Sequence, residues 1–249
     1  MTRRRWIADT WTATTASLTG EQAEHLARVL RAAPGQIYDV VAGGFLHRAE
    51  IVSVLPSSST QSAEVLFNLH EELESDSALP LHLLLAVFKF DHMEWAIEKA
   101  TELGVARITP VLARRTEKHL AQAARKRAER WRRIALEASK QSRRTTIPGI
   151  SEPLALKGAL KLVDSPMRIL LSETEQTTNI ASALQKTKHA DHESEFTHAV
   201  AIGPEGGWTP EEMAIFTEHG WQHVTLGPRI LRAETAAIAA IAILSSHLA

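Results

Sequence analysis

IGPEGGWTPEE, residues Ile202 to Glu212, is the stretch of sequence that decides the fold. It overlaps the end of an apolar run, HAVAI (198–202), and the five positions after that run hold three glycines and a proline. Thr209 then suits a helix N-cap, Pro210 suits the first helical position, and Glu212 can close a capping box. The stretch therefore predicts a buried strand, a glycine-rich loop and a helix. The surplus of glycines indicates a loop that wraps a ligand.

Two further apolar runs end in loops of the same kind. RILL (168–171) is followed by Ser172-Glu173-Thr174, and HVTL (223–226) is followed by GPRILRAET (227–235). Ligands of open α/β sheets bind beyond the carboxyl ends of the strands, so we expect the three loops to lie around one site. The N–H groups that begin the helix after Thr209 suit a carboxylate or a phosphate.

Standard catalytic and nucleotide-binding motifs are missing from the sequence. It has no P-loop GxxxxGKS/T, no GxGxxG after the first long apolar strand, no HExxH among its twelve histidines, and no GxSxG. Because it has no cysteine, disulfides, cysteine-ligated zinc and iron–sulfur clusters are excluded. We therefore expect no metal. We interpret the site as one in which a reactive cofactor carries the chemistry, while the protein positions and polarises the reacting groups.

The pattern of the 249 residues changes near residue 75. Residues 1–75 are rich in strand patterns: IYDVVAGGFLHRAEIVSVL (37–55) predicts a hairpin with its turn at Gly43-Gly44. One helix, with Thr19 as its expected cap, interrupts the strands. Short strands at close spacing predict a small β-barrel.

Residues 76–249 alternate apolar strands with helices. LHLLLAVF (81–88) is a continuous apolar strand, and Asp91 with Glu94 predicts a capping box for the next helix. Strands without polar alternation are covered on both faces, so a mostly parallel α/β sheet is expected. The last helix, 234–248, is apolar on all sides and is expected to pack in the core or against another subunit.

Charge is unevenly distributed along a chain whose formal net charge is −1. Residues 114–144 hold twelve of the 28 Lys and Arg residues and only three acids. Such a cluster is typical of a protein that binds a polyanion. A solvated helix face is the alternative, but the size of the imbalance favours nucleic acid.

No segment of the sequence suits a membrane. The apolar run AAIAAIAIL (236–244) is too short to cross a bilayer, and the start, MTRRRWIADTW, has no apolar stretch behind its arginines. We expect no membrane association and a cytoplasmic location.

Several segments together resemble the ribosomal RNA small subunit methyltransferase E family. They are EHLARVLR (24–31), FDHMEWAIEKATELGV (90–105), RWRRIALEASKQSRR (130–144), IGPEGGWTPEE and LGPRILRAETA (226–236). The resemblance implies an enzyme that uses S-adenosyl-L-methionine to methylate N3 of a uracil in 16S rRNA of the small ribosomal subunit. In the usual rRNA numbering this is uracil 1498.

The resemblance also implies a fold that no periodicity argument reveals. Residues 76–249 would form a SPOUT-type α/β domain with a deep trefoil knot, and residues 1–75 a PUA-like β-barrel that helps to hold RNA. The knotted faces would pair in a homodimer. The implied cofactor-binding residues are Leu171, Ser172, Glu173, Ile202, Gly203, Pro204, Glu205, Gly206, Gly207, Leu226, Gly227, Ile230, Leu231, Arg232, Ala233 and Thr235.

Catalytic and RNA-binding roles follow from the same resemblance. Arg232 would polarise the uracil and Glu234 would hold a loop N–H; the alternative is an ion pair between them that only orders the loop. The expected RNA contacts are Arg3, Arg4, Arg28, Arg31, Arg125, Arg127, Arg132, Arg143 and Arg144. The sequence departs from the family pattern at Glu24, Lys140 and Arg143, where a histidine, a glutamate and a glycine are usual.

Other functions remain as alternatives. A knotted methyltransferase can act on a ribose 2′-oxygen or on another base. A non-catalytic RNA-binding or assembly factor would have the basic cluster but would not bind the cofactor. A nucleotide-dependent oxidoreductase is disfavoured because its glycine fingerprint is missing.

Overall fold

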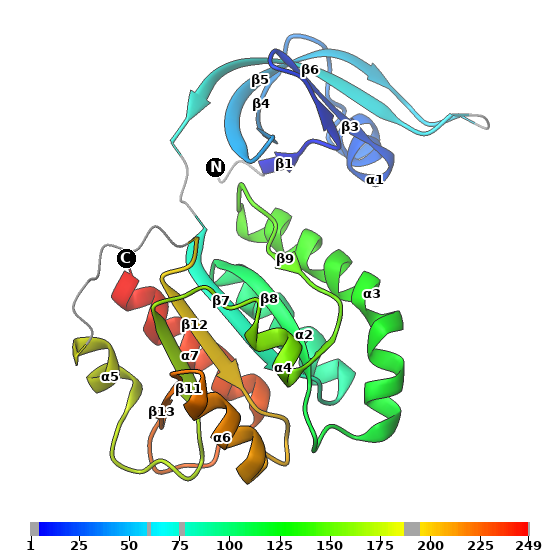
Figure 1. Cartoon of the computed structure of the whole chain (residues 1–249). Helices are drawn as coiled ribbons and strands as arrows, with labels where there is room; N and C mark the ends of the chain where they lie inside the picture. The colour runs from blue at the N-terminus through cyan, green and yellow to red at the C-terminus, as the bar shows by residue number, and fades with distance from the viewer. Residues whose placement is uncertain (1–4, 59–60, 75–77, 187–194, 249) are drawn as a thin grey trace. The chain divides into compact units, whose positions relative to one another are not determined.

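The computed structural model describes residues 5–58, 61–74, 78–186 and 195–248. The chain forms two compact units (Figure 1). The first unit comprises Met1–Ser77 together with Ser139–Thr146, and the second comprises Ala78–Ala138 and Ile147–Ala249. The sequence predicted a division near residue 75, but it did not predict that Ser139–Thr146 belongs to the first unit.

The first unit is a curled sheet of six strands. They are β1 (Arg5–Ile7), β2 (Thr10–Trp11), β3 (Thr15–Thr19), β4 (Ile37–Ala42), β5 (Phe45–Leu55) and β6 (Glu64–Leu73), in the order β1-β4-β5-β6-β3-β2. All neighbours are antiparallel except β1 and β4. Residues 5–11 contain both edge strands, β1 and β2, so this short segment joins the two edges of the sheet. Between the two strands, Ala8 N donates to Val41 O of β4 and Asp9 N donates to Ser17 O of β3.

The predicted hairpin is confirmed, with Gly43 and Gly44 both at positive φ in the turn between β4 and β5. Thr19 occupies the predicted N-cap position of the helix, but its side chain does not cap it. The helix is split into α1 (Gly20–Glu24) and a π-helical turn η1 (His25–Val29), and Thr19 makes no capping hydrogen bond. Its hydroxyl donates instead to Asp9, whose side chain also accepts the Thr19 N–H.

The second unit is built on a parallel sheet, as expected for an α/β fold. Its strands are β7 (Leu79–Ala86), β8 (Val105–Leu112), β9 (Gly149–Ile150), β10 (Leu154–Ala155), β11 (Met167–Leu171), β12 (His198–Ile202) and β13 (Gln222–Val224). Their order is β10-β8-β7-β12-β11-β13, and β9 also pairs with β8. Every described pairing is parallel.

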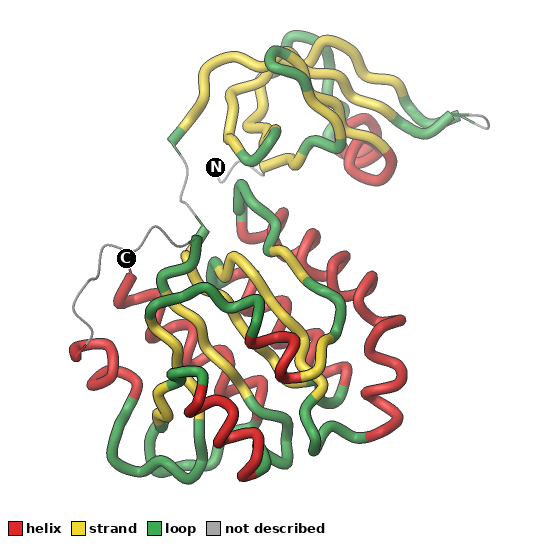
Figure 2. Tube along the Cα trace, viewed as in Figure 1, coloured by secondary structure: helices red, strands yellow, loops and turns green. Residues whose placement is uncertain are grey.

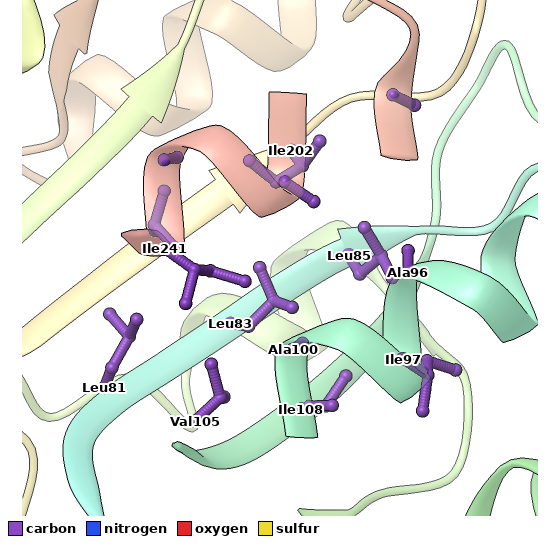
Figure 3. Close-up of a cluster of buried hydrophobic side chains, with 14 of the residues drawn as sticks. Leu81, Leu83, Leu85, Ala96, Ile97, Ala100, Val105, Ile108, Ile202 and Ile241 are labelled. Atoms are coloured by element: carbon purple, nitrogen blue, oxygen red, sulfur yellow. The ribbon is translucent and has the colours of Figure 1, made fainter. Parts of the chain in front are cut away.

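Helices cover both faces of this sheet (Figure 2). One face packs on α2 (Phe90–Glu102), α3 (Lys118–Ser142), α5 (Ile180–Lys186) and α7 (Ala233–Leu248). The other packs on α4 (Leu156–Leu160) and α6 (Pro210–Glu218). Alternate residues of β7 point to opposite faces, so Leu83 joins the first core, shown in Figure 3, and Leu84 joins the second.

The two predicted capping boxes have different outcomes. Thr209 and Glu212 form the predicted box at the start of α6. The box at Asp91 is wrong, because α2 begins at Phe90 and its N-cap residue, Lys89, makes no side-chain cap. Glu94 bonds instead to Arg130 and Arg127 of α3, at 2.7 and 3.2 Å.

The apolar helix α7 packs its inner side in the core, with Ala237, Ala240, Ile241 and Leu244 buried. Its outer side is apolar as well, and Ala242 and Ile243 are exposed there. Within the described residues no helix is long and apolar enough to cross a membrane.

Candidate active site

Three loops leave the carboxyl ends of adjacent parallel strands. In the sheet, β11 lies between β12 and β13, so residues 172–179, 203–209 and 225–232 emerge at one edge. Two of these loops are bonded to each other. Ser172 N donates to Val224 O at 3.0 Å, and Thr225 N donates to Thr178 O at 2.9 Å. The topology therefore brings the predicted loops together.

The glycines of the 203–209 loop meet different demands. Gly207 has φ 68, in the left-handed region, and its N–H donates to Pro204 O at 2.8 Å. A Cβ at Gly203 would lie 3.1 Å from Nε1 of Trp208, so this glycine lets the indole pack closely. Two of the glycines thus serve the loop's own conformation and packing, while the loop tip at Gly206 is exposed.

A neighbouring loop, after β8, holds the glycine loop in place. Arg115 Nη1 donates to Gly206 O at 2.6 Å and approaches Trp208 O at 3.4 Å. Glu212, 3% exposed, accepts the Arg114 N–H with one oxygen at 2.8 Å. Its other oxygen accepts the N–H of the N-cap residue Thr209 at 2.9 Å. One carboxylate therefore ties the start of α6 to the loop after β8.

Packing between aromatic side chains also supports the 203–209 loop. The Trp208 ring meets Phe216 of α6 edge to face at 4.9 Å between centroids, and Phe216 meets Trp221 in the same way at 5.1 Å. Edge-to-face pairs of buried rings contribute packing energy beyond their area. The loop thus has a rigid base on the side of α6.

The 172–179 loop is ordered by short polar side chains. Ser172 is buried and its hydroxyl bonds to that of Thr174 at 2.9 Å, whereas Glu173 is exposed. Glu175 accepts hydrogen bonds from the Thr177 hydroxyl and from the N–H groups of Thr177 and Thr178. The Thr177 hydroxyl above all, and these backbone N–H groups, lower the pKa of Glu175 to about 2. The turn is thus closed around an ionised carboxylate.

The 225–232 loop combines a tight turn with an exposed apolar tip. Thr225 Oγ1 donates to Gly227 O and accepts from Gly227 N, both at 3.1 Å, and Gly227 has φ 117. Ile230 is 84% exposed, while Leu226 and Leu231 are partly buried. Ile230 is therefore an exposed apolar side chain within this candidate ligand loop.

The predicted catalytic residues differ in environment. Arg232 is exposed, and its carbonyl accepts the Ala236 N–H at the start of α7. Glu234 is 5% exposed; its Oε1 lies 3.4 Å from Nδ1 of His92 in α2, and its Oε2 has no hydrogen-bond partner among the described residues. Within that part of the chain, the basic side chain beside the Glu234 carboxylate is His92 rather than Arg232.

The basic helix α3 carries both bound and free arginines. Arg127 is paired with Glu94 and lies over the ring of Phe90, 4.8 Å from its centroid. Arg132 is bonded to the Ile150 carbonyl and to two glutamates, Glu129 and Glu152, and Glu152 above all raises its pKa. Arg125 is exposed. Of the three arginines predicted on this helix, Arg125 is the one whose side chain is left to solvent.

The predicted RNA contacts of the first unit also differ. Arg28 forms an ion pair with Glu24 and bonds to the Ser57 hydroxyl at 3.2 Å. Glu24, which stands where the family usually has a histidine, therefore has a structural role. Arg31 is exposed and has φ 50. Arg3 and Arg4 lie outside the described residues.

The segment after α3 places its two arginines differently. Arg143 has φ 62, a conformation that favours glycine, and its carbonyl accepts a hydrogen bond from Arg5. The arginine found here in place of the usual glycine therefore strains the backbone. Arg144 is partly buried, which lowers its pKa to about 10, and Nη2 lies 3.5 Å from the Thr146 hydroxyl.

Sequence reasoning missed the residues that hold the loops. Arg115 had no local signal, Glu212 was interpreted only as part of a cap, and no pattern singled out His92. Among the described residues, no three His, Cys, Asp or Glu side chains are grouped as a metal site.

Comparison with known proteins identifies the family. Residues 75–245 match the model of the RNA methyltransferase domain. The chain is 34% identical to ribosomal RNA small subunit methyltransferase E of Synechocystis sp. over 92% of this chain and 72% of that protein. It is 32% identical to the enzyme of the same name from Bacillus subtilis, over 94% of this chain and 90% of that protein.

A solved structure shows the same fold over the whole chain. It is a ribosomal RNA small subunit methyltransferase E from Neisseria gonorrhoeae, bound to S-adenosyl methionine. The TM-score is 0.77 at 29% identity, and 98% of each chain is covered. By its sequence and by its fold, the chain belongs to the ribosomal RNA small subunit methyltransferase E family.

Proposed function

We propose that this protein transfers a methyl group from S-adenosyl-L-methionine to RNA of the small ribosomal subunit. One observation carries the proposal: three loops, two of them bonded to each other, meet at one edge of a parallel sheet. The family supports it, since its relatives are named for small subunit rRNA methylation and one is solved with S-adenosyl methionine bound.

The residues at this edge suit the cofactor. Adenosine needs apolar contacts for its ring, and Leu171, Leu226 and Leu231 are partly exposed there, with Ile230 beside them. The exposed backbone at Gly206 allows close approach of polar groups. We therefore keep the sixteen cofactor-binding residues named above as the proposed contacts, with Gly203 and Gly207 acting through loop shape.

When bound, the cofactor supplies a methyl group on a positively charged sulfur. The chain has to orient the uracil and stabilise the negative charge that appears when its N3 proton leaves. Arg232 is exposed at the start of α7 and suits this task. Glu234 Oε1 lies 3.4 Å from His92 Nδ1, and Glu234 Oε2 is able to accept a hydrogen bond from a bound molecule. Most of the rate would come from positioning.

N3 of uracil is the proposed target atom. Mass spectrometry of nuclease digests identifies the modified atom and separates this proposal from a ribose 2′-oxygen or another base. Calorimetry separates both from a non-catalytic RNA-binding factor, which would not bind S-adenosyl-L-methionine.

The deciding experiment uses labelled cofactor with small subunits and with free 16S rRNA, each from cells that lack this enzyme. Label on either confirms the activity, and label on the subunit alone defines the assembled particle as the substrate. Label on neither contradicts the proposed function.

Three structural proposals accompany the activity. A knot is supported by the path of the chain, because α7 follows the edge strand β13 and yet packs against α2 and β7. A homodimer is supported by the apolar outer side of α7 around Ile243. A PUA-like first unit is supported by its curled sheet. A cytoplasmic location follows from the proposed substrate.

A further inference from the structure

A buried carboxylate lies directly behind one of the candidate ligand loops. Glu234 is the second residue of α7, which begins where the 225–232 loop ends, and it is 5% exposed. Its Oε2 has no hydrogen-bond partner among the described residues, and in that part of the chain no lysine or arginine forms an ion pair with it. An unpaired buried charge is strongly unfavourable, so this carboxylate needs a cation beside it.

The side chain that can supply this cation is His92 of α2. Its Nδ1 lies 3.4 Å from Oε1 of Glu234, and its Nε2 lies 3.7 Å from Oδ2 of Asp91. Both ring nitrogens thus face carboxylates. A neutral imidazole carries a proton on one nitrogen and a lone pair on the other, which a carboxylate repels, whereas the imidazolium carries a proton on both. The arrangement therefore favours the protonated ring.

The two contacts of the ring differ in strength. Asp91 is 78% exposed, so water and salt screen its charge, whereas the Glu234 side chain is buried. Nδ1 makes no hydrogen bond with Glu234 or with any other described residue, so the contact depends on charge rather than on direction. A neutral ring gains little from a contact of this kind. The contact with Glu234 is therefore formed when the ring binds a proton and lost when the ring releases it.

The other charged and titratable groups around α2 have partners of their own or lie away from the ring. Those with other partners are Glu94 with Arg127 and Arg130 of α3, Lys99 with Glu98 and Glu102, Arg107 of β8 with Glu195, and His82 of β7 with Thr109. Lys89, before α2, and Arg232, before α7, are exposed, and His247 lies at the far end of α7. The ion pairs of His92 are therefore those with the two carboxylates.

The contact joins a helix held in the core to the helix that follows an exposed loop. Met93 and Ile97 bury one side of α2 in the core. The 225–232 loop carries the exposed Ile230 and ends just before the first turn of α7. A contact between α2 and Glu234 therefore restricts the position at which this loop ends.

We propose that protonated His92 is a positioning residue for the cofactor site: its ion pair with Glu234 fixes the first turn of α7 and the end of the 225–232 loop. The favourable pair exists only while His92 holds its proton, so cofactor affinity should fall as the pH rises through the range in which histidine titrates. The inference rests on the proposed function in that the 225–232 loop binds S-adenosyl-L-methionine.

Isothermal titration calorimetry of the full-length protein with S-adenosyl-L-methionine tests the pair. Between about pH 5.5 and about pH 8, the wild type should lose about fivefold in affinity. His92→Lys carries a positive charge at every pH in this range and should keep the higher affinity throughout. His92→Asn places a neutral amide near the position of Nδ1 and should show the lower affinity throughout.

His119→Gln is the matched control. Nδ1 of His119 lies 3.4 Å from Oε2 of Glu117, the same distance as in the His92 pair, but both of these side chains are exposed. This variant should keep the pH profile of the wild type. The inference is overturned if the wild-type affinity does not fall with pH, or if His92→Asn and His92→Lys both show the wild-type profile.

Hydrogen exchange of the amides in the first turns of α7, measured without cofactor, separates this inference from the proposed function. At about pH 8 these amides should exchange about fivefold faster in the wild type than in His92→Lys, and at about pH 5.5 the two proteins should agree. Equal exchange at both pH values would overturn the ion pair. If exchange follows the expected pattern but no protein binds S-adenosyl-L-methionine, the proposed function fails and the ion pair stands.

Discussion

At the level of single residues, the shape of the glycine loop depends on a side chain 91 positions earlier in the chain. Arg115 binds the Gly206 carbonyl, and the backbone of its neighbour Arg114 binds Glu212. A hydrogen bond from a charged donor is worth about 1.5–3 kcal/mol, enough to select one loop conformation. Arg115 is thus a positioning residue for the proposed cofactor site.

Replacing Arg115 with alanine should weaken S-adenosyl-L-methionine binding by about tenfold, because the loop loses the donor that fixes its tip. Isothermal titration calorimetry measures the change. Arg114→Ala is the matched control: its contact to Glu212 is made by the backbone N–H and survives the substitution. Equal affinities of the two variants would contradict the role of Arg115.

Local signals in the sequence predict local contacts and little else. The Thr209–Glu212 box was predictable because both partners lie within one turn of helix. The contacts of Arg115 with Gly206 and of His92 with Glu234 join distant segments, so only the folded sheet brings them together. The resemblance to the family named the loops, but their mutual support became visible only in the structure.

At the level of elements, apolar runs predicted the central strands of the parallel sheet, since strands buried on both faces need no polar alternation. The short strands β1, β2, β9 and β10 were missed because two or three residues carry no periodicity. The π-helical turn in 25–29 was missed because its residues suit an α-helix equally well. Asp91 was misassigned because the N-cap position lies two residues earlier, at Lys89, and α2 begins at Phe90.

The two helix starts give a direct comparison of stability. Thr209→Ala removes the cap of α6 and should lower the free energy of unfolding by about 1 kcal/mol. Asp91→Ala should change it by less than about 0.5 kcal/mol, because Asp91 is exposed and does not cap α2. Urea denaturation followed by circular dichroism measures both, and a larger loss for Asp91→Ala would contradict the assignment.

At the level of the whole molecule, a buried histidine makes the second unit sensitive to acid. His82 in β7 bonds to Thr109, and burial, with a smaller effect of Arg107, lowers its pKa from 6.5 to about 4. Between these values the unfolded chain binds the proton more readily than the folded one. Stability should therefore fall as the pH is lowered from 6.5 to 4, by up to about 3 kcal/mol.

Denaturant titrations between pH 7 and pH 4 measure this loss. His82→Gln should show a smaller dependence on pH over that range, whereas His70→Gln, which changes an exposed histidine of the first unit, should behave as the wild type does. The same pH dependence in all three proteins would rule out His82 as its source.

The proposed homodimer makes a separate prediction. If the outer side of α7 forms the subunit interface, Ile243→Glu should shift the protein to monomers, because a charge cannot be buried there without a partner. Size-exclusion chromatography with light scattering measures the mass. Leu162→Glu places the same charge at another exposed apolar position of the second unit and should leave the mass unchanged.

The first unit is built from two segments that lie far apart in the chain, and this has a consequence for protein synthesis. Its compact unit includes Ser139–Thr146, and Arg5 in its first strand bonds to the Arg143 carbonyl. During translation the N-terminal residues leave the ribosome long before that segment is synthesised. The first unit therefore lacks this segment while α2, β8 and most of α3 emerge. A fragment that ends at residue 77 would lack the segment 139–146 and its hydrogen bond to Arg5 as well.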